Sequence, residues 1–432
     1  MAATAAVAAV WGAAWVTSIH AVYSAWAVVA LCVAVLVLFA ALWSGAAYGA
    51  PSARLLLFAV PTGLLSVVLA PPMINEVPTV RGLLVVGIVV VCLALVAWLV
   101  VLAPARRAVR WPAGVVAGVV LLTAVGYALV IAGSHPLIDV WVILQDTARG
   151  LLHGQNPYRM AFPNVPPGQT SGCFNYWPVT FLSTAPGAWL FGDVRYLETG
   201  YVVATAGLLA WQAGRSSGWQ DRRRIGMAVL VGLLPGTLLI VQQAWTEPML
   251  LLGMVGAAIL IHRDHPTWAA VPLGLALATK QHLVVLLPLL LFWPRFGWRR
   301  LLVTGGVAAA VSLPWAVADW PRYKLCTVDF FLGEQGPSQS LSVWRLLPSA
   351  VQLPLLVVGF AGAVVIVLLR CPRTPGGFLI ASGSVLSVFN LLNKQTFMNQ
   401  WWLAGALVLA GMAMGPVVAD VTRPVRSAVR AR

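Results

Sequence analysis

Charged side chains are scarce in this sequence, where only 9% of the 432 residues are Asp, Glu, Lys or Arg. An ordinary globular domain carries about 25% charged and about 45–50% apolar residues. Here 60% of the residues are hydrophobic and the mean hydropathy is +0.88. This composition excludes a water-soluble protein of such length. It also excludes a disordered chain, which needs low hydrophobicity and high charge.

Paired cysteines and alternating strands are missing too. The five cysteines include no CxxC pair, which excludes a zinc or iron–sulfur framework built on such pairs. The six histidines are scattered, and we expect no metal and no other cofactor. A transmembrane β-barrel alternates apolar and polar residues, whereas runs such as 83–103 are apolar throughout. The sequence therefore predicts an all-α polytopic membrane protein.

The formal net charge of +15 is explained by membrane topology. Basic clusters lie between the apolar runs, at 106–110, 215–224, 295–300, 370–373 and 423–432. If these clusters are cytoplasmic, as the positive-inside rule asks, that side carries the whole excess, and the outer side is neutral although it holds most carboxylates. No nucleic-acid partner is needed, and the tail 419–432 is expected to contact anionic membrane lipids.

A helix that crosses a bilayer needs about 20 apolar residues, and on that basis we predict about fourteen transmembrane helices with both termini cytoplasmic. They lie near 3–18, 23–46, 54–74, 82–103, 112–134, 197–214, 225–244, 247–262, 300–319, 347–369, 377–392 and 400–418, with a hairpin over 267–294. Segment 177–191 is apolar, but a crossing there would place the basic cluster 222–224 outside. We therefore predict a re-entrant or interfacial segment on the outer face.

The hairpin over 267–294 is too short to cross the bilayer squarely, since each arm of about 13 residues spans about 20 Å. Its tip, Lys280-Gln281-His282, should then lie below the outer surface. Charge at that depth is costly and indicates a functional site. The alternative is a lysine whose ammonium reaches the interface along its apolar stem.

The outer loop 135–196 contains a predicted surface helix from Asp139 to His153, because its apolar residues recur at helical spacing. Asp139 stands at the start of this helix, where it could cap the helix or act as a general base. Asp146 and Arg149 lie on the opposite face, either as a solvated pair or as contacts for an acceptor. Gly154 ends the helix.

A second outer loop spans 319–346 and could close over an acceptor, with a solvated loop as the alternative. Cys173 and Cys326 both fall in outer loops. Because the outer compartment is oxidising, we predict a disulfide between them.

Several of these motifs together resemble the GT-C superfamily of integral-membrane glycosyltransferases. They are an outer-loop acid, a surface helix followed by Gly154-Gln-Asn-Pro-Tyr158, then Asn175-Tyr-Trp-Pro178, Thr246-Glu-Pro248 and Lys280. The pattern is most similar to glycosyltransferase family 87, which includes actinobacterial polyprenol-phosphate-mannose-dependent mannosyltransferases. The likeness covers 112–418, which would be a GT-C-like catalytic unit preceded by accessory helices over 1–111. Two features depart from the family pattern: about four helices precede that unit, and Tyr176-Trp177-Pro178 replaces the more usual Tyr-Pro-Pro.

The resemblance implies an inverting hexosyltransferase of the plasma membrane, with its active site on the extracytoplasmic face. A polyprenyl-phosphate sugar, with mannose expected, would pass to a lipid-linked or glycan acceptor of the cell envelope. Asp139 would be the catalytic base. The residues expected to bind the donor phosphate or sugar are Lys280, His282, Glu247, Lys394 and Tyr158, and those expected near the acceptor are Asp146, Arg149, Tyr176 and Arg345.

Two alternatives remain at this point. Glu247 could instead be a charge partner for a helix N-terminus. The whole protein could be a multispan transporter or a flippase for lipid-linked sugars, although such folds usually show repeated halves with broken helices at matching positions.

Overall fold

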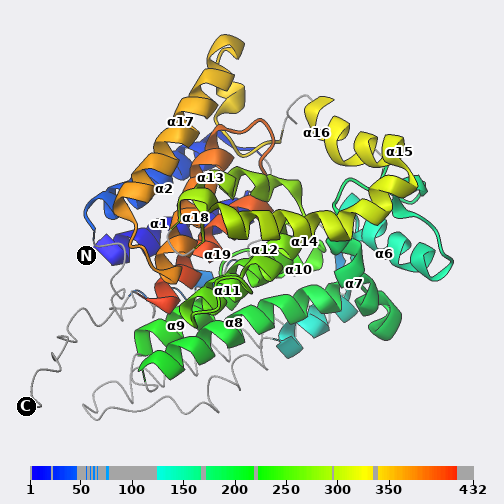
Figure 1. Ribbon diagram of the computed structural model, residues 1–432, viewed down its shortest axis with the longest axis horizontal. Coiled ribbons are helices and arrows are strands. Elements are labelled where there is room, and N and C mark those ends of the chain that lie inside the picture. The colour runs from blue at the N-terminus through cyan, green and yellow to red at the C-terminus, as the bar shows by residue number, and fades with distance from the viewer. Residues whose placement is uncertain are drawn as a thin grey trace, which may run out of the picture.

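The computed structural model describes residues 2–20, 23–45, 74–76, 124–166, 172–217, 222–293, 296–333 and 339–415, with a few isolated positions between 55 and 66. This part of the chain is mostly helical (Figure 1). Its longer helices are α1 (Ala2–Ile19), α2 (Ala25–Trp43), α6 (Asp139–Leu152), α7 (Pro178–Phe191), α8 (Arg195–Ser217), α9 (Arg222–Gly232), α11 (Glu247–His262), α14 (Gly297–Ala318), α17 (Ser349–Arg370), α18 (Pro375–Leu392) and α19 (Met398–Met414). The shorter helices and turns are η1 (Pro157–Arg159), α10 (Thr237–Gln242), α12 (Ala270–Leu277), η2 (Gln281–Leu286), α13 (Leu287–Phe292), α15 (Trp320–Lys324), η3 (Leu325–Asp329), α16 (Phe330–Gly333) and η4 (Trp344–Leu346).

Six helical stretches in the described part are long and apolar enough to cross a membrane. They are Ala2–Ile19, Ala25–Trp43, Arg223–Gln242, Gly297–Ala318, Ser349–Arg370 and Pro375–Leu392. The predicted class, an all-α membrane protein, is therefore confirmed. The number fourteen stays a prediction, because the expected helices 54–74, 82–103 and 112–134 lie largely outside the described residues.

The centre of the bundle is formed by α18 and α19, which pack along each other (Figure 1). Nearly every residue of α19 is buried, as expected for a helix that is apolar on all sides and enclosed by others. Helices α14 and α17 are equally apolar but mostly exposed. Large side chains such as Leu302, Val317 and Leu369 point outward from them. These two helices present the kind of surface that lipid would cover.

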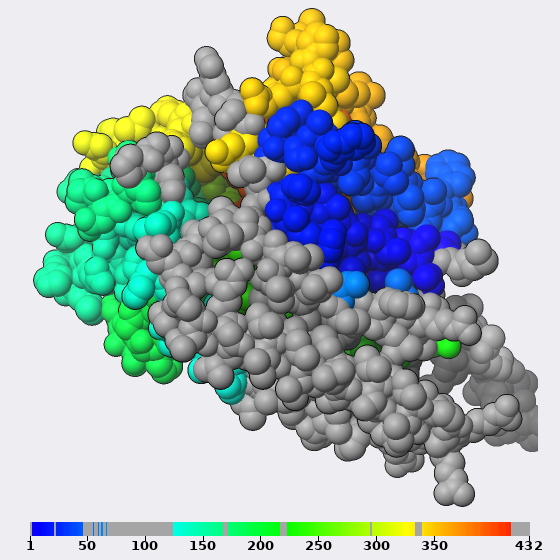
Figure 2. All heavy atoms as spheres, turned by 180° about the vertical axis from the view of Figure 1, so that it is seen from behind, coloured from blue at the N-terminus to red at the C-terminus, as the bar shows by residue number. Residues whose placement is uncertain are grey.

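Helices α1 and α2 belong to the same bundle. α1 packs against α2 and α19, and α2 packs against α17 and α18. Ala6, Val7 and Leu31 share one apolar core with the C-terminal helices. From behind, α1 and α2 form a continuous surface beside α17 and away from α6 (Figure 2). The described start of the predicted accessory unit 1–111 is thus packed into the main unit.

The structure contains one small antiparallel ladder in the described residues, between β1 (Ile74–Glu76) and β2 (Ser134–Pro136), with Asn75 opposite His135. The predicted topology puts both turns on the outer side. Hydrogen-bonded strands must lie on the same side of a membrane, so their pairing agrees with that topology. It also ties the N-terminal half to the segment that leads into Asp139.

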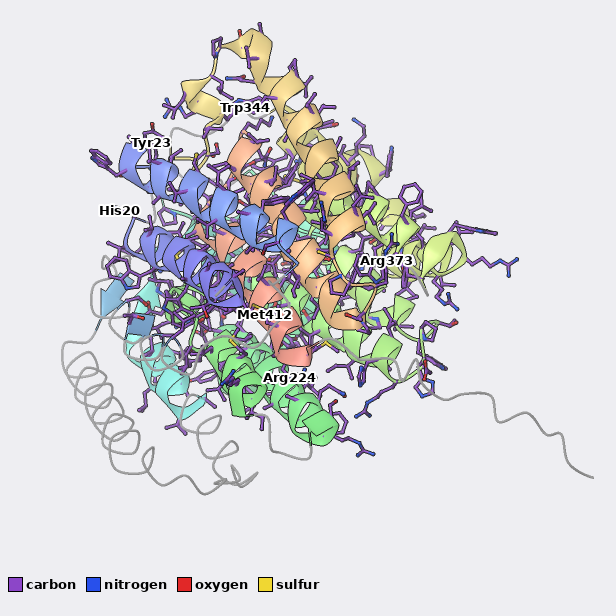
Figure 3. All side chains as sticks on the ribbon, turned by 90° about the vertical axis from the view of Figure 1, so that its left-hand side faces the viewer. His20, Tyr23, Arg224, Trp344, Arg373 and Met412 are labelled. Carbon is purple, nitrogen blue, oxygen red and sulfur yellow. A yellow bond between two sulfur atoms is a disulfide. The ribbon has the colours of Figure 1, made fainter. Side chains whose placement is uncertain are left out.

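Residues near the ends of the helices lie toward two different ends of the molecule (Figure 3). Trp344, Tyr23 and His20 lie toward one end of the molecule, and Arg224 and Met412 toward the other (Figure 3). Two Trp rings in segments predicted to be near the cytoplasmic side lie under guanidinium groups: Arg263 is 4.0 Å from the ring centroid of Trp211, and Arg370 is 3.8 Å from that of Trp43. Such cation–π pairs suit a membrane interface.

Two predicted elements differ in detail from the structure. The single helix expected over 225–244 is two helices, α9 and α10, because Pro235 and the left-handed Gly236 (φ +88°) interrupt it. Segment 177–191 is one continuous helix, α7, despite Pro186 inside it. It ends at left-handed Gly192 (φ +84°), and the chain then turns into α8.

Candidate functional site

The acid predicted as the catalytic base begins helix α6. Asp139 is the first helical residue rather than the N-cap, which is Ile138. This corrects the expected capping position by one residue. Its Oδ1 accepts a hydrogen bond from the backbone N–H of Val140 at 2.8 Å. The expected apolar stripe is largely buried, and only Leu152 at its end is exposed.

Helix α6 is fixed to the corner between α7 and α8. Gln145 donates to the carbonyl of Gly192 at 2.8 Å and accepts from the backbone N–H of Val194 at 3.1 Å. Trp189 of α7 donates from Nε1 to the carbonyl of Ala148 at 2.7 Å. These contacts hold the middle and the second half of α6 against the corner between α7 and α8.

A buried ion pair completes this anchor. Arg195, 1% exposed, donates to Asp193 (Nη2 to Oδ2, 2.7 Å) and to the hydroxyl of Ser134 (2.9 Å). Asp193 also accepts from Trp141 Nε1 on α6 at 3.3 Å. The Arg195–Asp193 pair thus connects α8 to β2 through Ser134 and to α6 through Trp141. Because each partner of the pair is hydrogen-bonded, the burial cost of the charges is offset.

The segment that leads into α7 docks onto the tip of the predicted hairpin, which is formed by α12, η2 and α13. The backbone N–H of Trp177 donates to the carbonyl of Thr279 at 3.2 Å, and the Thr180 hydroxyl donates to the same oxygen at 2.7 Å. Gln281 Nε2 donates to the carbonyls of Asn175 (3.4 Å) and Thr327 (3.2 Å). These bonds bring Tyr176 and Lys280 together.

Lys280 lies at the centre of the candidate site. Its ammonium donates to Glu247 Oε1 at 2.7 Å and lies 5.6 Å from the ring centroid of Tyr176. Asn399, in the first turn of α19, donates to the same carboxylate oxygen at 2.9 Å. The Glu247 side chain is fully buried, and that of Lys280 is 12% exposed. The tip of the hairpin is therefore held inside the protein.

The pKa of Tyr176 is affected by the charge of Asp139. Burial raises the pKa of the Tyr176 phenol well above its usual value, and the negative charges of Asp139, Glu247 and Glu198 raise it further. Direct contacts join three predicted site residues, Glu247, Lys280 and Tyr176, which come from three segments far apart in the sequence. The charge of Asp139 acts on the same phenol.

Tyr158 lies beside this site but does not face it. Its side chain is 1% exposed, and its hydroxyl donates to the carbonyl of Tyr176 at 3.0 Å. The rings of Phe174, Phe181 and Tyr323 surround it edge-on. An enclosed ring whose hydroxyl already has a partner is badly placed to bind a donor. The structure gives Tyr158 the role of positioning Tyr176.

A disulfide and an ion pair join the loop before α7 to the segment over 319–329. Cys173 and Cys326, predicted as a disulfide, are joined, with their Cα atoms 5.7 Å apart. Arg159 Nε donates to Asp319 Oδ2 at 2.6 Å. That bond and one from the Arg322 backbone N–H lower the pKa of Asp319. The loop before α7 is thereby tied to the second outer loop.

Reduction of this disulfide is expected to lower the melting temperature of the purified protein. The bond closes a loop of 153 residues, and in the chain-entropy model long loops give about 4–5 kcal/mol, although measured values are typically about 2–4 kcal/mol. Thermal unfolding in detergent with and without reductant measures the effect. The double variant Cys173→Ser/Cys326→Ser should melt at the temperature of the reduced protein, and added reductant should not change its melting temperature. Equal melting of the wild type in both conditions would contradict the prediction.

The remaining predicted site residues lie around the rim or apart from it. Arg149 pairs with Asp146 at 3.3 Å on the outer face of α6, with its side chain 67% exposed. Arg345 is exposed in η4, and Lys394 is half-buried. The Leu341 backbone N–H donates to the Thr396 carbonyl at 2.7 Å and joins the loops that carry Arg345 and Lys394. The ring nitrogens of His282 are buried and have no hydrogen-bond partner among the described residues, close to the Lys280 charge.

The sequence prediction missed Glu198, in the first turn of α8. Its carboxyl is 0% exposed and interacts electrostatically with Glu247 and Lys280. The available signal was its place near the start of an apolar helix, since an acid inside a membrane segment suggests function.

In the comparisons with known proteins, no family model, curated protein or solved structure matches this chain.

Proposed function

We propose that this protein is a membrane glycosyltransferase that moves a sugar, with mannose expected, from a polyprenyl-phosphate donor to a cell-envelope acceptor on the outer face of the plasma membrane. The observation that supports the proposal is the buried cluster of Glu247, Lys280 and Tyr176, whose phenol also feels the charge of Asp139. In the proposed reaction Asp139 is the proton acceptor, and the held ammonium group of Lys280 is the partner for a departing phosphate.

The reaction needs one base and help for the leaving group. An acceptor hydroxyl attacks the anomeric carbon of the donor sugar and forms the new C–O bond, while the C–O bond to the lipid phosphate breaks. The proton of the hydroxyl passes to Asp139, and the polyprenyl phosphate leaves with the bonding electrons. Attack opposite the leaving group inverts the anomeric centre, so a β-linked donor gives an α-linked product.

Lys280 can serve the phosphate without leaving Glu247. An ammonium group has three N–H donors, and one of them goes to Glu247 Oε1. The other two can meet phosphate oxygens, with the His282 ring nearby. Glu247 then acts as a positioning residue, because it holds the ammonium at the tip of the hairpin.

A transfer assay tests the proposal directly. Membranes containing the protein should move radiolabel from polyprenyl-phosphate [¹⁴C]mannose into glycolipid or glycan of the producing cell envelope, above membranes that lack it. Arabinosyl and glucosyl lipids would identify another donor sugar. If no sugar lipid yields product under conditions where the protein is folded and abundant, the proposed chemistry is wrong.

A transporter or flippase is the second candidate, and the buried acids favour it. Glu198 and Glu247 are both fully enclosed within helices, and such residues often belong to ion or proton pathways in membranes. A flippase would move the lipid-linked sugar between leaflets of a proteoliposome with its glycosidic bond intact. Product formation distinguishes the two, because only the transferase releases polyprenyl phosphate.

A further inference from the structure

The Glu198 carboxyl is a buried polar group without a hydrogen bond to protein. It is 0% exposed, and neither oxygen has a partner among the described residues. A buried group left in this way loses its hydration without replacement, at a cost of about 1–3 kcal/mol or more for a charged group. Native proteins contain few such groups, and each needs an explanation.

Other buried polar side chains, at the starts of α11 and α19, also lack hydrogen-bond partners among the described residues. Glu247 Oε2, the Asn399 carbonyl oxygen Oδ1, the Thr246 hydroxyl and both polar atoms of the Gln243 side chain are buried and lack partners within the described part of the chain. Three of these residues lie at or just before the start of α11, and Asn399 is bonded to Glu247. Helices α8, α11 and α19 pack against one another, and Glu198, Glu247 and Asn399 each stand in the first turn of one of these helices.

The charges of Glu198, Glu247 and Lys280 indicate which kind of ligand these residues could bind. An anion is disfavoured, because Glu198 and Glu247 both carry carboxylates there. A cation is also disfavoured, because the Lys280 ammonium already lies 2.7 Å from Glu247 and would repel it. The described residues contain no group of three His, Cys, Asp or Glu that could hold a metal ion. The donors and acceptors match a neutral molecule with several hydroxyls, since carboxylate and amide oxygens accept hydrogen bonds and amide and hydroxyl groups donate them.

We infer that Glu198, Gln243, Thr246 and Asn399 form a subsite that binds the hydroxyls of a sugar ring, namely the sugar carried by the lipid phosphate. The inference rests on the proposed function and adds to it the residues that recognise the sugar. Glu198 is placed to accept hydrogen bonds from ring hydroxyls, while Glu247 holds Lys280 toward the phosphate. The sugar and the phosphate are thus bound by different residues of one site.

Binding of two lipids distinguishes the sugar subsite from the site that binds the phosphate. Full-length protein in lipid nanodiscs is titrated with sugar-free polyprenyl phosphate and with polyprenyl-phosphate mannose. The wild type should bind the mannosyl lipid more tightly. Glu198→Gln should leave the Kd for polyprenyl phosphate within about twofold and weaken binding of the mannosyl lipid about tenfold, the loss expected when one carboxyl oxygen is replaced by an amide NH2 that cannot accept a hydrogen bond.

Thr246→Val is a second, milder variant. Thr246 is the N-cap of α11, but its side chain makes no capping hydrogen bond, so replacement by a residue of equal shape removes only the hydroxyl. It should weaken binding of the mannosyl lipid about threefold or more and leave polyprenyl phosphate unaffected. This variant tests the subsite even if Glu198→Gln does not fold.

Gln212→Ala is the matched control on the same helix. Gln212 is 4% exposed, its Oε1 also lacks a partner among the described residues, and it lies 14 positions, or about 21 Å, along α8. Both affinities should stay unchanged. The inference is overturned if Glu198→Gln and Thr246→Val weaken both lipids equally or neither, or if the wild type binds the two lipids equally. If the wild type binds neither lipid, the proposed function itself fails.

Discussion

Replacement of Asp139 by Asn is expected to lower the rate of sugar transfer by about 10²–10⁴-fold, the contribution typical of a general base. The amide has the same shape, and its oxygen can still accept the hydrogen bond that Asp139 Oδ1 takes from Val140. What is lost is the ability to take a proton from the acceptor hydroxyl. The start of α6 should stay in place, because Gln145 and Asp193 anchor the helix independently. Initial rates with labelled polyprenyl-phosphate mannose, in membranes of equal protein content, measure the effect.

Asp264→Asn provides the matched control for this substitution. Asp264 lies in the turn after α11, with a left-handed backbone (φ +60°) that Asn also tolerates. It belongs to a predicted cytoplasmic loop, away from the site. The Asp264→Asn variant should transfer sugar at the wild-type rate. If Asp139→Asn transferred sugar as fast as this control, the base would have to be another residue.

The helices could largely be predicted from the sequence, because long apolar runs leave few alternatives in a membrane. Helix α11 has the predicted bounds, and α17 and α18 differ by at most two residues at each end. Helix α19 begins two residues and ends four residues before the predicted bounds. The break between α9 and α10 was missed. Pro235-Gly236 lies inside an apolar run, and hydropathy alone does not register the backbone change that these residues impose.

The site was only partly predictable. Asp139, Glu247 and Lys280 stand at turns, where position relative to the helices indicates exposure to the outer side. Glu198 lies inside a helix, and no local pattern shows which way its side chain points. That depends on how α8 packs against α11 and α19. The enclosure of Tyr158 by Phe174 and Tyr323 could not be predicted for a similar reason, since it joins segments far apart in the sequence.

Lys280→Met is expected to destabilise the protein by about 3–5 kcal/mol, the loss typical when one partner of a buried ion pair is removed. Methionine keeps much of the apolar stem but leaves the Glu247 carboxylate, 0% exposed, without its cation. Asn399 would then be the only bonded neighbour that the described residues give to this carboxylate. The free energy of unfolding in mixed detergent micelles, from denaturant titration, measures the change.

Adding Glu247→Gln to Lys280→Met should restore most of the lost stability, because the uncompensated charge is removed and the glutamine oxygen can still accept from Asn399. A double-mutant cycle then isolates the coupling between the two side chains. The exposed pair Lys324–Asp329, at 2.6 Å with side chains 47% and 39% exposed, is the control and should couple by about 0–1 kcal/mol. Equal coupling in both pairs would mean that the Glu247–Lys280 pair is solvated and is not held inside the helical bundle. Strong coupling, together with loss of transfer in the stable double variant, would show that the pair is needed for the reaction as well as for the fold.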